Sequence, residues 1–162
     1  MEYITDLRDE PEHLGLLAQW HHREWSYLNP NRTQAQRAEN MKHYLGDNLI
    51  PSTYVYKNGT TVLGSAAVVE SDMDTHPELG PWLAGVYVHA DHRQQGVGSM
   101  LVKHIINKCM ANAVTDLYLF TPGQAKFYEQ LGWRTLKTEE YCGTLVTIMT
   151  LPLKSHPVAG AS

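Results

Sequence analysis

A strand, a glycine-rich turn and a helix follow one another between residues 83 and 111, and this order constrains the fold more than any other feature. The run Leu-Ala-Gly-Val-Tyr-Val-His over residues 83–89 is typical of a strand. Residues 98–111 place apolar side chains at helical spacing, and a second short apolar strand is expected over residues 116–120. A strand, a helix and a strand in this order predict a parallel βαβ unit.

Antiparallel strands are expected on both sides of this unit. Residues 52–57 and 61–70 are joined across Asn58-Gly59, a strong hairpin signal, and a further pair is expected around Cys142-Gly143. With a first strand at residues 2–7, the fold class is α/β in the mixed α+β sense. It has a central mixed, mostly antiparallel sheet of about seven strands flanked by about four helices, with a parallel βαβ core.

Two helix starts carry capping patterns. Thr33 and Gln36 form a capping box before an apolar stripe. Thr121 and Gln124 suggest a second box, with Pro122 at the first helical position. We therefore expect helices to begin directly after Thr33 and Thr121.

Length and composition exclude several classes of protein. A chain of 162 residues is expected to form one domain, over residues 1–154, with a loose tail over residues 155–162. The formal net charge of -4 argues against nucleic-acid binding, which needs a basic surface. Two cysteines, no secretory signal and no long apolar segment predict a cytoplasmic protein without a membrane span.

The turn between the strand and the helix is a candidate anion site. Its residues supply the unpaired N–H groups of a helix N-terminus, glycines that let a phosphate approach the backbone, and a guanidinium: Arg93, Gln94, Gln95, Gly96, Val97, Gly98 and Ser99. A Rossmann fingerprint is excluded by Leu101, and a P-loop by the missing lysine. A diphosphate suits the turn.

The pattern Arg-x-x-Gly-x-Gly directly after an apolar strand resembles the coenzyme A motif of the GNAT acetyltransferase superfamily. A later motif of that superfamily is matched by Ala125, Phe127, Tyr128, Glu129, Leu131, Gly132 and Trp133. The resemblance covers about the second half of the chain and implies an N-acetyltransferase with acetyl-CoA as co-substrate. One departure is Pro122, which stands where an asparagine often contacts the coenzyme.

The resemblance also assigns the rest of the coenzyme site. The backbone of Val86, Tyr87 and Val88 is expected to bind the pantetheine arm, and the N–H of Val86 or Val88 to polarise the thioester oxygen. Gln124 is a weak substitute for the missing asparagine. Phe127 is counted with the coenzyme-binding residues, although its ring is expected to pack in the core.

Acetyl transfer needs a proton donor for the thiolate and a base for the amine. By resemblance Tyr128 is the acid; the alternative is a ring that only packs on its helix. Some family members carry a glutamate where this chain has Gly85, so Asp72 and Glu70 in the acidic connection before the strand are the candidate bases. A solvated acidic loop is the alternative there. Direct attack is expected rather than an acyl-enzyme.

The acceptor is expected to be a small cationic amine. Trp25, Tyr27 and Tyr141 are candidate aromatic contacts for a cation. The acidic residues within positions 70–78 would attract a positively charged amine. Two alternatives stay open: a protein N-terminus or lysine as acceptor, and a non-catalytic acyl-CoA-binding regulatory module. No metal site is expected, and a homodimer is compatible with an exposed edge strand.

Overall fold

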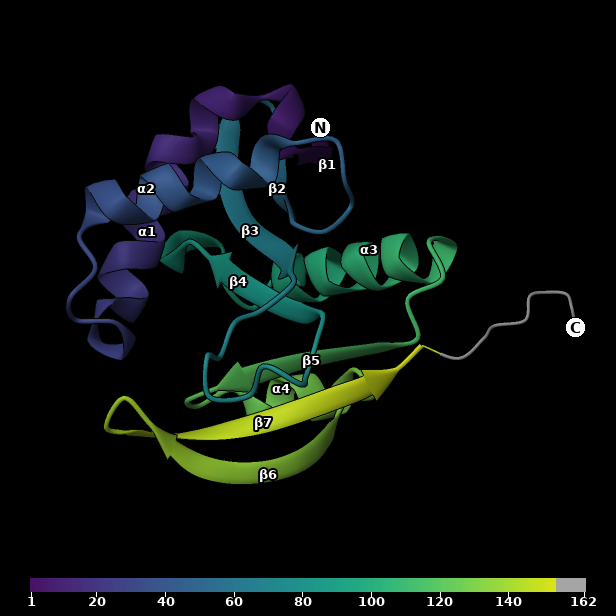
Figure 1. The fold of residues 1–162 in the computed structure, drawn as a ribbon. Coiled ribbons are helices and arrows are strands. Elements are labelled where there is room, and N and C mark those ends of the chain that lie inside the picture. Colours follow the sequence, from purple (N-terminus) through teal and green to yellow (C-terminus); the bar gives the residue numbers. More distant parts are fainter. Residues whose placement is uncertain (154–162) are drawn as a thin grey trace, which may run out of the picture.

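The computed structural model describes residues 1–153 as one seven-stranded sheet with helices on both faces (Figure 1). The strands are β1 Glu2–Asp6, β2 Ser52–Asn58, β3 Thr61–Val69, β4 Trp82–Val88, β5 Asp116–Thr121, β6 Arg134–Tyr141 and β7 Thr144–Pro152. They lie in the order β1-β2-β3-β4-β5-β7-β6, and only β4 and β5 pair in parallel. The predicted mixed, mostly antiparallel sheet is confirmed.

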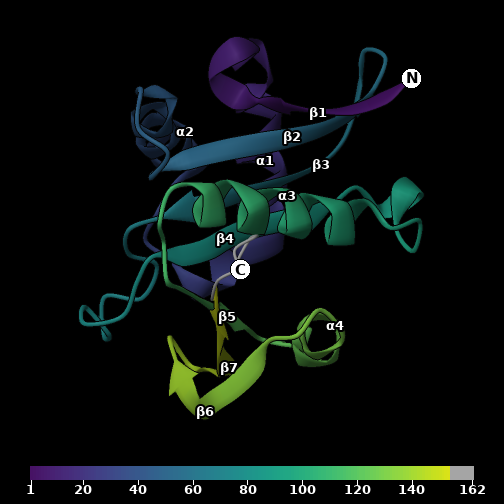
Figure 2. The ribbon, with the colours of Figure 1, turned by 90° about the vertical axis from the view of Figure 1, so that its right-hand side faces the viewer.

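Four α-helices cover the sheet: α1 Leu14–Trp25, α2 Gln34–Met41, α3 Val97–Ala111 and α4 Ala125–Gln130. Helix α3 packs across β2, β3 and β4 on one face, and α1 lies behind the same strands on the other (Figure 2). Alternation along the strands supplies both layers. Leu63 and Leu83 face the cluster that contains α3, whereas Val55 and Val62 pack with Leu17 of α1.

Local signals set two of the predicted boundaries correctly. The Thr33 hydroxyl accepts from the Gln36 N–H, and the Gln36 side chain accepts from the Thr33 N–H, so the capping box before α2 is confirmed. The hairpin between β2 and β3 is also confirmed, with a positive φ of 61° at Gly59 and Asn58 paired to Thr61 as the last strand residue.

The second capping box is wrong. Helix α4 begins at Ala125, and its N-cap residue Gln124 makes no side-chain cap. The Thr121 hydroxyl instead accepts from the N–H groups of Gly123 and Gln124, 3.4 and 3.0 Å away, and so closes a turn. Pro122 therefore lies in this turn and not at the first helical position, because a threonine hydroxyl caps a turn as readily as a helix.

Strands β4 and β5 separate soon after they meet, which creates the main opening in the sheet. Their only paired positions are Trp82 and Tyr118. Farther along β4, Gly85 has a φ of +59° and lies in a bulge opposite β3. The later backbone groups of β4 are consequently free of a ladder on the β5 side.

No helix within residues 1–153 is long and apolar enough to cross a membrane. The expected tail over residues 155–162 lies outside the described residues, and the single-domain boundary at residue 154 stays a prediction.

Candidate active site

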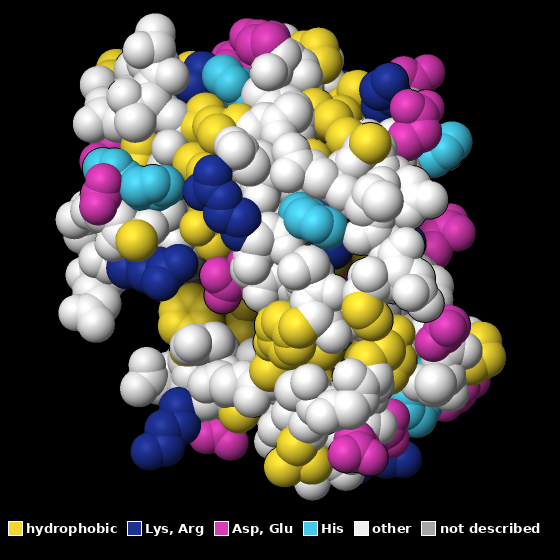
Figure 3. Space-filling view, turned by 90° about the vertical axis from the view of Figure 1, so that its left-hand side faces the viewer, with side chains coloured by type: hydrophobic (Ala, Val, Ile, Leu, Met, Phe, Trp, Pro, Cys, Tyr) yellow, Lys and Arg dark blue, Asp and Glu magenta, His cyan; other side chains and the backbone are white. Residues whose placement is uncertain are grey.

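The separation of β4 and β5 opens a groove on the edge of the molecule that carries the N-terminus of α3. In Figure 3 hydrophobic side chains are recessed between the half that carries α1 and α2 and the half that carries α4. Val86 and Val88 of β4 and Phe127 of α4 are partly buried against the core on the two sides of this gap. Tyr87 points to the opposite face, where its ring lies 5.3 Å from that of Trp20.

The N-terminus of α3 opens onto this groove. Gly96 is its N-cap with a φ of +85° and no side-chain cap, so the first N–H groups of the helix have no internal acceptor. A β-carbon at Gly98 would stand 3.4 Å from Phe127 Cζ and 3.5 Å from Val88 Cγ2. Gly98 therefore faces Val88 and Phe127, which lie on the two sides of the gap, and the free N–H groups of the helix N-terminus fit a bound diphosphate.

The remaining residues of the turn are brought to the same rim. Gln94 has a φ of +61°, and Arg93, Gln94 and Gln95 are exposed. Arg93 Nε donates to the Val88 carbonyl over 2.8 Å, and its guanidinium carbon lies 5.7 Å from the centre of the Tyr87 ring. A guanidinium held at this rim leaves further N–H groups for phosphate oxygens.

Not every side chain of the motif is available to the groove. Val97 is buried in the core, so only its backbone N–H is available. Ser99 is partly buried at the first turn of α3. Gln124 is exposed at the start of α4, where its backbone N–H is bound to Thr121. Coenzyme binding by the main chain of this turn stays a prediction.

Tyr128 lies on α4, on the far side of the groove from β4. It is 8% exposed, with its ring 4.9 Å from that of Phe127 and 6.1 Å from that of Trp133. Burial raises the pKa of Tyr128 well above its ordinary value of 10. The hydroxyl is therefore protonated at neutral pH, as a proton donor must be.

The connection between β3 and β4 covers the face of β5–β7 opposite α4. Met73 anchors it in the core, and Asp72 beside it faces α2. Burial raises the pKa of Asp72 to about 6, and the nearby charges of Arg32 and Arg37 offset only part of that shift. A carboxylate with a pKa near 6 is suited to take a proton at neutral pH.

The predicted aromatic residues lie on the sheet face opposite α3 and α4, which we call the second face. Trp25 ends α1, with its ring 6.1 Å from that of Tyr87. Tyr141 ends β6, stacks edge-on against Phe120 at 5.4 Å and donates to the Asp74 carboxylate over 3.4 Å. Tyr27 is 49% exposed beyond α1. Trp25 and Tyr141 thus add aromatic rings to the sheet face opposite α3.

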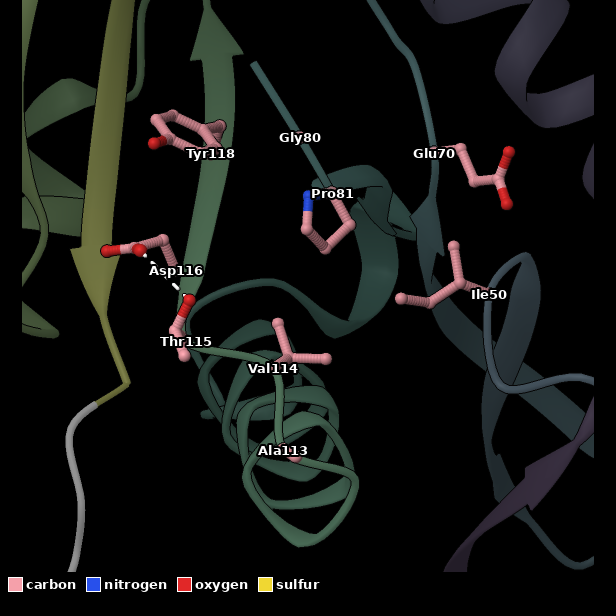
Figure 4. Close-up of a pocket in the computed structure, with 9 residues that line it drawn as sticks. All are labelled: Ile50, Glu70, Gly80, Pro81, Ala113, Val114, Thr115, Asp116 and Tyr118. Atoms are coloured by element: carbon pink, nitrogen blue, oxygen red, sulfur yellow. Dashed lines mark hydrogen bonds between the residues drawn. The ribbon is translucent and has the colours of Figure 1, made fainter. Parts of the chain in front are cut away.

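Glu70 is placed elsewhere. It lines an open pocket of about 400 Å³ with Gly80, Pro81, Ala113 and Asp116, among others. Figure 4 shows this pocket where β5 begins and where α3 has just ended. The structure thus brings Asp72, but not Glu70, near Tyr141.

The connection over β5–β7 is held by an ion cluster. His76 Nε2 lies 2.8 Å from a Glu139 oxygen, and His76 Nδ1 lies 3.3 Å from Glu78. Both carboxylates raise the pKa of His76, Glu139 first, and their own pKa values are lowered, chiefly by hydrogen bonding. The imidazole therefore joins β6 to the connection, and both carboxylates favour its charged form.

This cluster predicts a pH dependence of stability. A raised His76 pKa stabilises the fold fully below the ordinary value of 6.5, and that contribution is lost as the pH rises through the folded value. The glutamates contribute above about 4.5 and lose their contribution as the pH falls. We expect His76→Gln to lower the melting temperature more at pH 6 than at pH 8.5. Equal losses at both pH values would contradict this.

No sequence pattern points to His21 or Ser65, which meet beside β4. His21 lies buried on α1, with Nε2 2.9 Å from the Ser65 hydroxyl of β3. A β-carbon at Gly85 would stand 3.4 Å from His21 Cε1. His21 therefore fills the space that a side chain at position 85 would occupy.

The sequence matches a family of known acetyltransferases. Residues 51–135 match the family described as "Acetyltransferase (GNAT) domain". No curated protein matches the sequence of this chain.

Solved structures share the fold at low identity. An aminoglycoside 6'-N-acetyltransferase complexed with coenzyme A is 14% identical, with a TM-score of 0.76 over 96% of this chain and 99% of that chain. The ribosomal-protein-S18-alanine N-acetyltransferase from Escherichia coli is 19% identical, with a TM-score of 0.66 over 98% of both chains. A GNAT acetyltransferase from Staphylococcus aureus Mu50 is 18% identical, with a TM-score of 0.69 over 95% and 100%.

The family match spans the bulged strand β4, the open N-terminus of α3 and the helix α4 that together form the groove. The chain therefore belongs to the GNAT acetyltransferase family and is an acetyl-CoA-dependent N-acetyltransferase.

Proposed function

We propose that the acceptor is the primary amine of a small cationic molecule, which attacks the acetyl group directly. This proposal is supported by the rings of Trp25 and Tyr141, which lie on the same face of the sheet as Asp72. Aromatic faces and carboxylates attract cations. A solved neighbour of similar fold is an aminoglycoside 6'-N-acetyltransferase, which agrees with a small-molecule acceptor.

In the proposed reaction the carboxylate of Asp72 takes the proton of the ammonium group, directly or through a water molecule. The neutral amine forms a C–N bond to the acetyl carbon as the C–S bond breaks, and the nitrogen then loses a second proton, which restores the phenol of Tyr128 after that group has protonated the thiolate. The Val86 N–H stabilises charge on the acyl oxygen, and Tyr128 gives its proton to the departing thiolate. A pKa of about 6 for Asp72 makes the rate fall as the pH drops below that value.

Acceptance of a protein N-terminus is the second candidate. It is supported by a neighbour that is a ribosomal-protein-S18-alanine N-acetyltransferase. Tyr27 and the β6–β7 turn are exposed at the rim of this face, which is compatible with a peptide acceptor.

Thiol release from acetyl-CoA tests the proposal with two panels at matched concentration. The first holds diamines, polyamines and aminoglycosides, and the second holds peptides with free N-termini or lysines. Turnover with the first panel supports the proposal, and turnover confined to the second supports the peptide alternative. Tight coenzyme binding by calorimetry with no turnover in either panel would leave the regulatory-module alternative.

A further inference from the structure

The bulge in β4 is held from outside the strand by two buried polar side chains. Two β4 residues, Gly85 and Val86, face the single β3 residue Ala66. The Ser65 hydroxyl donates to the Gly85 carbonyl over 2.9 Å, and His21 Nε2 lies 2.9 Å from the same hydroxyl. Ser65 is fully buried, so neither bond is replaced by water at low cost.

The direction of the proton in each bond is fixed. Ser65 has one hydrogen, which it gives to the Gly85 carbonyl, and its oxygen must accept from His21. Burial lowers the pKa of His21 to about 3, so the ring is neutral and carries a single proton, on Nε2. The three groups therefore form a one-way chain, His21 to Ser65 to Gly85.

This chain decides where the Val86 N–H points. The Gly85–Val86 peptide is trans, so the carbonyl and the N–H on its two sides point in opposite directions. Since the Gly85 carbonyl is drawn to Ser65 of β3, the Val86 N–H is turned away from β3 and towards the gap beside β5. The positive φ of Gly85 permits this orientation.

We propose that His21 and Ser65 are positioning residues that hold the Val86 N–H in the groove as the donor to the thioester oxygen. The proposal rests on the acetyl transfer described above and extends it to two side chains far from the coenzyme motif. His21 also leaves no room for a larger side chain at position 85, because its ring lies against Gly85. A side chain of α1, His21, thus occupies the space that a larger side chain on β4 at position 85 would fill.

The test compares Ser65→Ala with Ser52→Ala. Ser52 is equally buried and its hydroxyl also has a partner, the Tyr54 hydroxyl at 3.4 Å, but it lies on β2 away from the bulge. Loss of a single oxyanion donor costs about 100- to 1,000-fold, so misdirecting one by Ser65→Ala should lower kcat about 10- to 100-fold. The dissociation constant of free coenzyme A, which has no acyl oxygen, should not change.

Two conservative variants separate positioning from a general loss of packing. Ser65→Thr keeps the hydroxyl and His21→Gln keeps an N–H donor, so both should retain more activity than Ser65→Ala and His21→Phe respectively. Circular dichroism and melting temperature show which variants are folded. If Ser65→Ala turned over like Ser52→Ala, or lost free coenzyme A affinity as much as kcat, the positioning role would be wrong. Absence of turnover in the wild type would instead remove the acetyl-transfer activity on which the role rests.

Discussion

Gly98→Val should weaken the binding of coenzyme A by about 100-fold or more. The new side chain projects between Val88 and Phe127, into the space that leads to the first N–H groups of α3. Blocking two charge-assisted hydrogen bonds to phosphate, at about 1.5–3 kcal/mol each, accounts for a loss of this size. Isothermal titration calorimetry with coenzyme A measures it directly.

The chain offers a matched control for this change. Gly15 is the second residue of α1, as Gly98 is of α3, and no atom lies within 4 Å of its missing β-carbon. Gly15→Val should bind coenzyme A like the wild type and unfold at a similar temperature. Tight binding by Gly98→Val would show that the diphosphate does not sit at the N-terminus of α3.

Tyr128→Phe should lower kcat about 10- to 1,000-fold and leave the affinity for coenzyme A nearly unchanged. In the proposed reaction the phenol protonates the departing thiolate, and its raised pKa keeps it protonated at neutral pH. Removal of one oxygen from a ring packed against Phe127 and Trp133 disturbs the core little. Single-turnover thiol release at saturating acetyl-CoA separates the chemical step from binding.

Tyr54→Phe is the companion control. Tyr54 is also buried and also has a raised pKa, but it lies on β2 beside His104 of α3 and does not line the groove. Its loss should affect stability without lowering kcat. An undiminished rate in Tyr128→Phe would reduce Tyr128 to a packing residue, which is the alternative that its sequence position leaves open.

Much of the fold could be read from the sequence because its signals are local. The Gly59 turn, the Thr33 capping box and the alternation along β2–β4 each depend on residues within a few positions of one another. The start of α4 could not be read in this way. Thr121 had two competing uses for its hydroxyl, as a helix cap or as a turn cap, and only the path of the chain after β5 decides between them.

The open helix N-terminus of the proposed coenzyme site was predictable for the same reason. Arg93, Gly96 and Gly98 lie on one continuous turn, and their chemistry follows from a helix N-terminus wherever the helix packs. For the proposed acceptor site, the sequence indicated only a set of residue types. Asp72 and Glu70 are two residues apart, yet one lies beside Arg37 and the other lines a pocket near the end of α3.

By itself, the sequence determined the order of strands and helices, the glycine turn before α3 and the family of the enzyme, because short-range patterns in the sequence carry each of them. The tertiary structure alone decided that His21, 44 residues from Ser65, stands over the bulge at Gly85. The physical reason is that such a contact depends on how α1 packs across β3 and β4. No spacing along the chain encodes that packing, since it results from the burial of the whole helix face.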